Sequence, residues 1–148
     1  MPPCGTLQQG VSVDLVAVLR RWSQRHRAFF VGGNEAGMLL GGEVRGAEAA
    51  VWRRGDLGRL TTRVPTVPPI LAVEVAGRDE GESELRDKAA WYLRHGVQIV
   101  WVVIPEAREL VVITLAGESR HRRGPLPRAP ALPGLAPSVR DFFRQIDG

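Results

Sequence analysis

The 148-residue chain contains one cysteine, Cys4, which rules out an intrachain disulfide and a cysteine-based zinc site. The longest uninterrupted apolar run covers residues 99–104, far short of the roughly 20 residues that a membrane-spanning helix needs. The first ten residues have neither a basic start nor an apolar stretch, so we expect no secretory signal. These absences predict a cytoplasmic protein without a membrane segment.

The motifs of several enzyme classes are also missing. The chain has no Gly-x-Ser-x-Gly nucleophile elbow, and its glycine pairs at 32–33 and 41–42 lack the phosphate-loop pattern. The three histidines, His26, His95 and His121, do not have the spacing of metal ligands. We therefore expect neither a serine or cysteine hydrolase nor a zinc enzyme.

Arginine is abundant. Of the 20 basic residues 19 are arginine, Lys88 is the single lysine, and the 16 acidic residues leave a net charge of +4. Residues 64–117 carry more acids than bases, whereas both flanking parts carry more bases. An acidic centre between basic flanks suits a metal-centred site approached by a polyanion, although many inert surfaces have the same pattern.

The length and the 44% apolar content predict a single domain over residues 1–148, with residues 1–10 flexible. Hydrophobic spacing predicts a helix over residues 12–25 with Ser12 as its N-cap, a helix over 82–95 and a short last helix over 138–146. Apolar runs rich in strand formers predict six strands, over residues 27–31, 36–40, 47–52, 70–76, 98–104 and 109–115.

With four of these strands before the helix over 82–95 and two after it, the order predicts an α/β (α+β) fold with a mixed central sheet flanked by helices. The first three strands are expected to form an antiparallel meander and the last two a hairpin. The helix over 82–95 lies between two apolar strands, which is typical of a parallel crossover. Residues 124–137 hold five of the 11 prolines and are expected to form an extended surface segment. Three tryptophans are assigned to core packing rather than base stacking, namely Trp52, Trp91 and Trp101.

Two carboxylates interrupt strand-like runs and need compensating partners if they are buried. Glu74 stands in the middle of the run over 70–76, and Glu48 lies in the run over 47–52. If the two strands pair, both carboxylates can converge on one hard cation such as Mg²⁺. Lys88 lies one helical turn after Glu84, so it is either a compact ammonium required by this site or simply one half of an i,i+4 ion pair.

Several residues in order along the chain resemble a known family. They are the run Pro68-Pro69-Ile70-Leu71-Ala72-Val73-Glu74-Val75, an acidic helix with Glu84, Lys88 and Tyr92, then Gly96-Val97 and Val100-Trp101-Val102-Val103-Ile104-Pro105. This combination, over about residues 44–143, resembles the restriction-endonuclease-like (Uma-type) family of the PD-(D/E)XK nuclease superfamily. The resemblance implies a restriction-endonuclease-like core.

The resemblance also implies roles for individual residues. Glu74 matches the acid of the second strand, Lys88 the lysine on the following helix, and Glu48 the first acid, where the family usually has Pro-Asp. In such nucleases the two acids hold Mg²⁺, for which Mn²⁺ can substitute, together with a backbone carbonyl that here belongs to Val75. The lysine steadies or helps to activate the attacking water. The implied function is a Mg²⁺-dependent endonuclease that hydrolyses DNA phosphodiester bonds.

Two other interpretations stay open. The replacement of Pro-Asp by Ala47-Glu48 leaves room for a catalytically silent relative that binds nucleic acid or protein. The other interpretation is an unrelated α/β domain in which Glu74 is a structural carboxylate. A homodimer is expected only from the family type and from how common such assemblies are.

Two groups of arginines bear on DNA as the expected partner. Each is either a solvated surface or a contact to DNA phosphates, and contact predicts an affinity that falls linearly with the logarithm of salt concentration. One group lies on the polar face of the first helix and consists of Arg20, Arg21 and Arg25. The other follows the last predicted strand and consists of Arg120, Arg122, Arg123 and Arg128.

Overall fold

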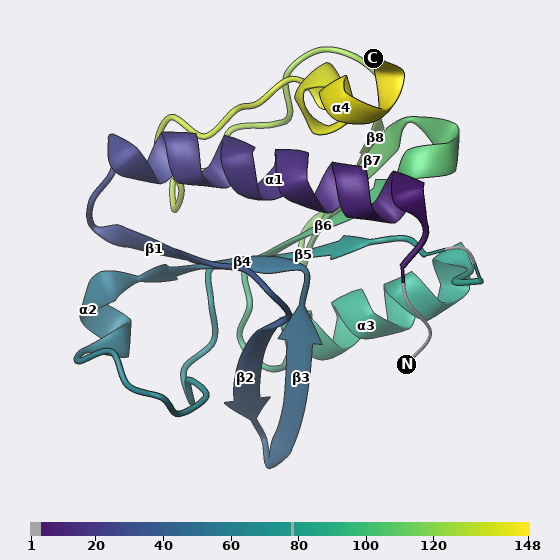
Figure 1. Ribbon diagram of the computed structural model, residues 1–148. Helices are drawn as coiled ribbons and strands as arrows, with labels where there is room; N and C mark the ends of the chain where they lie inside the picture. Colours follow the sequence, from purple (N-terminus) through teal and green to yellow (C-terminus); the bar gives the residue numbers. More distant parts are fainter. Residues whose placement is uncertain (1–3, 78) are drawn as a thin grey trace.

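A six-stranded sheet with helices on both faces forms the centre of the structure, a computed structural model that describes residues 4–77 and 79–148 (Figure 1). The helices are α1 (Thr6–Gln24), α2 (Arg54–Leu57), α3 (Glu82–Arg94) and α4 (Arg144–Asp147), with 3-10 turns η1 (Pro105–Ala107) and η2 (Val139–Phe142). The strands are β1 (Phe29–Gly32), β2 (Ala36–Leu40), β3 (Glu43–Ala47), β4 (Ala49–Arg53), β5 (Leu71–Val75), β6 (Ile99–Ile104), β7 (Glu109–Thr114) and β8 (Gly117–His121).

The main sheet has the order β1-β4-β5-β6-β7-β8 and is mixed, which confirms the predicted fold class. Only β5 and β6 run parallel in it, joined by the crossover helix α3, and the other neighbours are antiparallel. The predicted β6–β7 hairpin is confirmed, and β4, which begins directly after Glu48, pairs with the Glu74 strand β5. Strand β8 was not predicted, because it is polar and mostly exposed.

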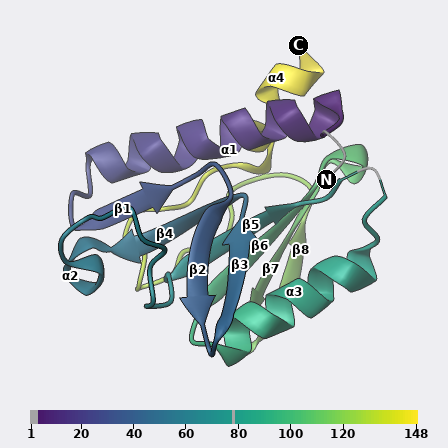
Figure 2. The ribbon, with the colours of Figure 1, turned by 60° about the horizontal axis from the view of Figure 1, so that its bottom comes forward.

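The prediction of a meander in the first half is wrong. Strand β1 pairs with β4, whereas β2 and β3 form a separate two-stranded hairpin between them (Figure 2). The chain leaves the main sheet at Asn34 and Glu35, whose φ angles of 56° and 57° are left-handed. It reverses at Gly41 and Gly42, which also have positive φ.

Each face of the main sheet has its own apolar core. On one face, α1 and the C-terminal segment cover the sheet; on the other face lie the β2–β3 hairpin and α3 (Figures 1 and 2). Trp101 belongs to the first core and Trp52 and Trp91 to the second, and all three are buried, as predicted. Because a strand alternates its side chains, Val73 and Val75 face α1 while Ala72 and Glu74 face α3.

The expectations for the two ends of the chain need correction. Residues 6–10, expected to be flexible, form the first turns of α1, so Ser12 is not an N-cap but lies inside the helix; residues 1–3 lie outside the described part. The proline-rich segment is extended but not only a surface segment, since its leucines are buried against α1: Leu126, Leu132 and Leu135. The predicted last helix is split into η2 and α4 at Phe143. Across the residues described, no helix is both long and apolar enough to span a membrane.

Candidate active site

Glu74 lies near the end of β5 on the α3 face, with 5% of its surface exposed. Its Oε1 accepts a hydrogen bond of 2.6 Å from the hydroxyl group of Tyr92 on α3. The strand places Glu74 here because its neighbours Val73 and Val75 fill the opposite core. Strand β5 is buried on both faces, and its one carboxylate, Glu74, is held in place by the hydroxyl group of Tyr92.

Glu48 lies at the point where the chain passes from the hairpin into the main sheet, between β3 and β4, rather than inside a strand. Its backbone N–H donates to the carbonyl of Val73, which puts it beside the end of β5. Two side chains of α1 donate to its carboxylate: Gln8 to Oε1 at 3.0 Å and Ser12 to Oε2 at 3.2 Å. The first turns of α1 and the start of α3 lie on opposite faces of the sheet but at the same end of it, beside the end of β5 (Figure 1).

The amide nitrogen of Gln8 also donates to the backbone carbonyl of Val75, at 3.3 Å. One donor therefore faces two of the three expected ligands, the Glu48 carboxylate and the Val75 carbonyl. Carboxylate and carbonyl oxygens are the ligands that Mg²⁺ prefers. Beside them opens a cavity of about 280 Å³ lined by Gln8, Gly77 and Glu80 among others. Glu48, Glu74 and Val75 do not line this cavity themselves, so the fit to a small hard cation rests on their oxygens.

The fit depends on a backbone ligand. Over residues 4–77 and 79–148, no three side chains of His, Cys, Asp or Glu are grouped so that they could hold a metal ion. The expected ligand set contains only two such side chains, Glu48 and Glu74, and the Val75 carbonyl is the third. Mg²⁺ commonly keeps several water ligands and therefore needs few ligands from the protein. A larger cation such as Ca²⁺ takes more protein oxygens, so this small ligand set suits Mg²⁺ better.

Lys88 contacts this site through an acid that the sequence analysis did not select. Its Nζ forms an ion pair of 2.7 Å with Glu80, from the segment between β5 and α3, rather than with Glu84. The other carboxylate oxygen of Glu80 accepts a hydrogen bond from the backbone N–H of Gly77 at 3.2 Å. Glu80 therefore ties the lysine to the backbone just beyond β5.

The charges of the site act on one another. Burial raises the pKa of Glu74 to about 7, against the opposing effects of the Tyr92 hydrogen bond and the Lys88 charge, and the charges of Glu48 and Glu80 raise it further. Burial alone would lower the pKa of Lys88, but its hydrogen bond to Glu80 and the charge of Glu74 outweigh burial and raise it. Lys88 is therefore an ammonium ion at neutral pH, while Glu74 titrates there.

The structure brings together all four predicted site residues, Glu48, Glu74, Val75 and Lys88, around the end of β5. Sequence reasoning missed their partners Gln8, Ser12 and Glu80. Only Glu80 left a signal, as an acid close before the helix that carries the single lysine. Gln8 and Ser12 are 40 and 36 residues from Glu48, and no local pattern links them.

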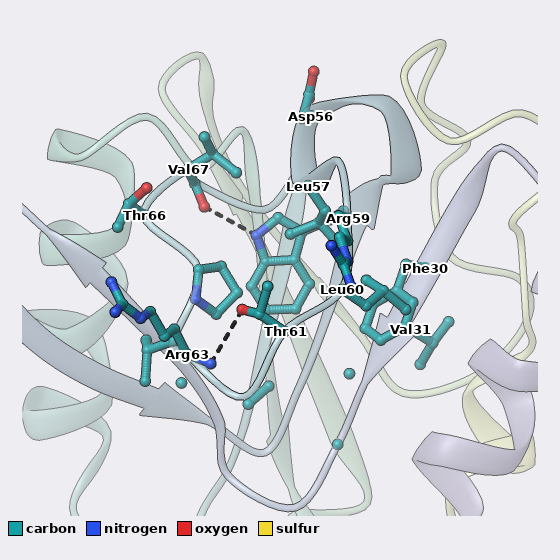
Figure 3. Close-up of a pocket in the computed structure, with 17 residues that line it drawn as sticks. Phe30, Val31, Asp56, Leu57, Arg59, Leu60, Thr61, Arg63, Thr66 and Val67 are labelled. Atoms are coloured by element: carbon teal, nitrogen blue, oxygen red, sulfur yellow. Dashed lines mark hydrogen bonds between the residues drawn. The ribbon is translucent and has the colours of Figure 1, made fainter.

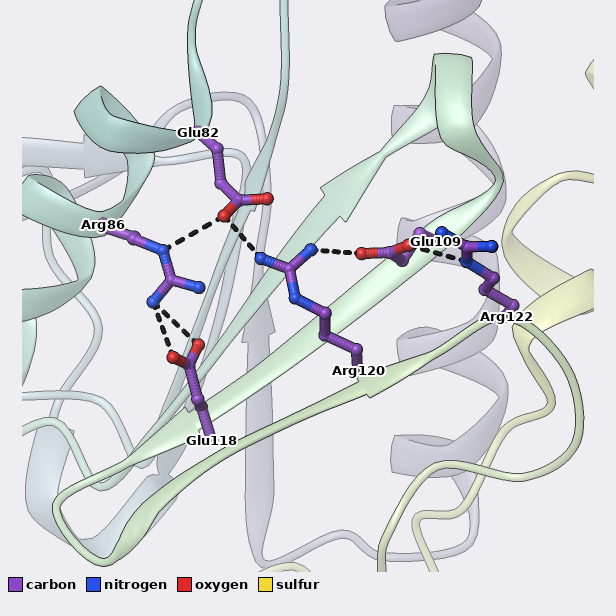
Figure 4. A network of polar contacts seen from close by, with 6 residues as sticks. All are labelled: Glu82, Arg86, Glu109, Glu118, Arg120 and Arg122. Carbon is purple, nitrogen blue, oxygen red and sulfur yellow. Dashed lines mark hydrogen bonds and ion pairs between the residues drawn. The ribbon is translucent and has the colours of Figure 1, made fainter.

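Two arginines of the basic stretch after β7 form ion pairs within the chain. Arg120 contacts both Glu82 and Glu109, and Arg122 contacts Glu109, whose surface is 3% exposed (Figure 4). Arg86 of α3 joins the same network through Glu82 and Glu118. These ion pairs link α3 to β7 and β8. Arg120 and Arg122 are thus engaged by carboxylates of their own chain.

Comparisons with known proteins agree with this architecture. The family model described as "Uma2: Putative restriction endonuclease" matches residues 1–140. Among solved structures, the chain is similar to a crystal structure from Anabaena variabilis ATCC 29413, described as that of "a putative nuclease belonging to DUF820". The two are 15% identical with a TM-score of 0.86, over 97% of this chain and 83% of that one, which shows a shared fold. No curated protein matches the chain.

Proposed function

The chain belongs to the Uma2 family of restriction-endonuclease-like proteins, and from this premise we propose that it is a Mg²⁺-dependent endonuclease that hydrolyses phosphodiester bonds in DNA. The family description and the nuclease-fold neighbour support nuclease activity. DNA as the substrate and Mg²⁺ as the cofactor rest on the chemistry of the site.

One observation carries the proposal. The Gln8 amide donates to both the Glu48 carboxylate and the Val75 carbonyl, so these two oxygens face one point beside the end of β5, the strand that also carries Glu74. In a purely structural arrangement, a buried carboxylate is paired or neutralised and needs no opening beside it. Here a cavity opens beside the end of β5, lined by Gln8, which contacts Glu48, and by Ala76 and Gly77, which follow Val75.

Glu48, Glu74 and the Val75 carbonyl would hold the cation, with Mn²⁺ as a substitute. A divalent cation bound there supplies Lewis-acid stabilisation of the charge that develops on an attacked phosphate. The ammonium of Lys88, held by Glu80, adds a fixed positive charge beside the same carboxylates and can donate hydrogen bonds to a phosphate oxygen or an attacking water.

The raised pKa of Glu74 makes cation binding measurable without any substrate. Glu74 must be ionised to act as a ligand, and at pH 7 about half of it carries a proton in the metal-free protein. Cation binding near pH 7 should therefore release a proton. At pH 9, where Glu74 is already ionised, this release should disappear.

The experiment titrates Mg²⁺ and Mn²⁺ into the wild type, Glu74→Ala and a control, Glu84→Ala, which removes an exposed carboxylate from the same region. Each protein is also incubated with plasmid and single-stranded DNA. We expect the wild type and the control to bind the cation and cleave DNA, and Glu74→Ala to do neither. A folded wild type that neither binds the cation nor cleaves would contradict the proposal and favour a silent binding module.

A further inference from the structure

Two sets of arginines differ in their surroundings. Six of them form ion pairs with carboxylates of the same chain: Arg45, Arg86, Arg108, Arg120, Arg122 and Arg144. At the junction of α1, β1 and α2 the situation differs. There Arg20, Arg27 and Arg54 line one hollow of about 610 Å³ with Ser23 and Gln24, and no acidic residue borders it.

These three arginines, which we call the arginine surface, are exposed and form no ion pair within the described part of the chain. Two of them are held in position by neutral partners. Arg20 donates to the hydroxyl group of Ser23 at 3.1 Å, and Arg54 donates to the backbone carbonyl of Arg27 at 3.1 Å. A guanidinium has five N–H donors, so most donors stay available. Like charges held together without acids suit an anion with several charges.

The positive surface continues into the neighbouring cavity. The guanidinium of Arg54 lies over the ring of Phe30, 5.5 Å from its centroid, and Phe30 lines a cavity of about 590 Å³. Arg59 and Arg63 border the same cavity, as Figure 3 shows. Asp56 also borders this cavity, so the part of the surface without an acid is the hollow of Arg20, Arg27 and Arg54. Arginines nonetheless border both cavities, which indicates an extended anionic partner rather than a single small ion.

The arginine surface lies on the same flank of α1 as the candidate active site. Ser12, which donates to Glu48, and Ser23, which lines the hollow, are 11 residues apart in one helix. Eleven residues make about three turns, so both side chains point the same way, about 16 Å apart along the axis.

We propose that Arg20, Arg27 and Arg54 bind the phosphate backbone of duplex DNA on the same flank of α1 as the active site, and that Arg59 and Arg63 extend this surface. The placement of a scissile phosphate near Glu48 and Glu74 rests on the proposed function, whereas phosphate binding by the arginines does not. Because the contacts are to phosphates, they position the duplex and carry no direct sequence information.

The test measures the affinity of a labelled duplex of about 20 base pairs at several salt concentrations, in EDTA so that nothing is cleaved. It compares the wild type with Arg20→Gln/Arg27→Gln and with the matched control Arg94→Gln/Arg140→Gln, which removes two exposed arginines elsewhere. Each lost phosphate contact should lower the slope of log affinity against log salt by about 0.9. We expect the double variant to lose nearly two from the slope and the control to retain it.

Several results would overturn the inference. A slope in the double variant equal to that of the control would do so, as would wild-type binding to vesicles of anionic phospholipid with no binding to the duplex. If the double variant unfolds, Arg27→Gln alone decides, because the Arg27 side chain donates no hydrogen bond within the described residues, and an unchanged slope then refutes the surface. Separately, duplex binding with the expected slope but no cleavage in Mg²⁺ would contradict the proposed function and leave the surface standing.

Discussion

Replacing Glu74 with glutamine should stabilise the fold at neutral and alkaline pH in the absence of metal. Glutamine resembles the protonated carboxyl group in size, and its amide oxygen can still accept the hydrogen bond from Tyr92. The substitution therefore removes the buried charge and keeps the shape of the site. Its effect on stability should depend on pH in a way that identifies Glu74 as the source.

The magnitude follows from linkage. Burial raises the pKa of Glu74 from an ordinary 4.5 to about 7, so between these two values the folded chain holds a proton that the unfolded chain has lost. The stability from this group is thus complete below pH 4.5 and is lost as the pH rises through 7. At about 1.4 kcal/mol per pKa unit, the loss amounts to about 3 kcal/mol. Glu74→Gln should avoid it.

The measurement is urea unfolding in EDTA from pH 4 to 9 for the wild type, Glu74→Gln and the exposed control Glu84→Gln. We expect Glu74→Gln and the wild type to be about equally stable below pH 4.5 and to diverge by about 3 kcal/mol above pH 7. Curves that stay parallel over the whole range would refute the argument, since they would mean that Glu74 titrates equally in both states.

Adding Mg²⁺ extends the same experiment. A cation that binds only the folded wild type at about 100 times its dissociation constant should add about 2.7 kcal/mol of stability. Glu74→Gln lacks the charge that the cation needs and should gain much less. Equal gains in stability in both proteins would mean that the cation binds without the Glu74 carboxylate.

Three further predictions concern Lys88, Glu109 and Leu132. Lys88→Arg should keep Mn²⁺ binding but lower the DNA cleavage rate at least tenfold, since a bulkier guanidinium cannot replace a compact ammonium; an unchanged rate would argue against that role. The Arg122 and Arg120 contacts lower the pKa of Glu109, so their stabilisation is present at pH 7 and lost as the pH falls below about 4.5. Glu109→Gln should therefore unfold at lower urea concentration than the wild type at pH 7, and this gap should narrow as the pH falls below about 4.5; a gap that does not narrow would contradict this. Leu132→Ala should lose about 2–5 kcal/mol in urea unfolding because Leu132 is 2% exposed, whereas the same change at the exposed Leu115 should cost under about 0.5 kcal/mol; similar losses at both would place Leu132 outside the core.

The sequence by itself determined the parts of this protein in which neighbours along the chain decide the outcome. The apolar strands on either side of the helix over 82–95 allow only a parallel crossover that buries them, and the structure has it as β5, α3 and β6. A carboxylate in such a strand must find partners, which is why the amino-acid pattern alone is enough to select Glu74 as a candidate site residue.

Only the tertiary structure decided which residues meet the carboxylates. Gln8 and Ser12 reach Glu48 because α1 covers one face of the sheet, and a helical period says nothing about which strand end the helix will cover. Lys88 pairs with Glu80 rather than Glu84 because the chain between β5 and α3 folds back toward it. The hairpin β2–β3 leaves the main sheet at two left-handed residues, and the leucines of the proline-rich segment enter the core, since packing between distant segments overrides local pattern. The sequence thus determined which groups need partners, and long-range packing determined which partners they have.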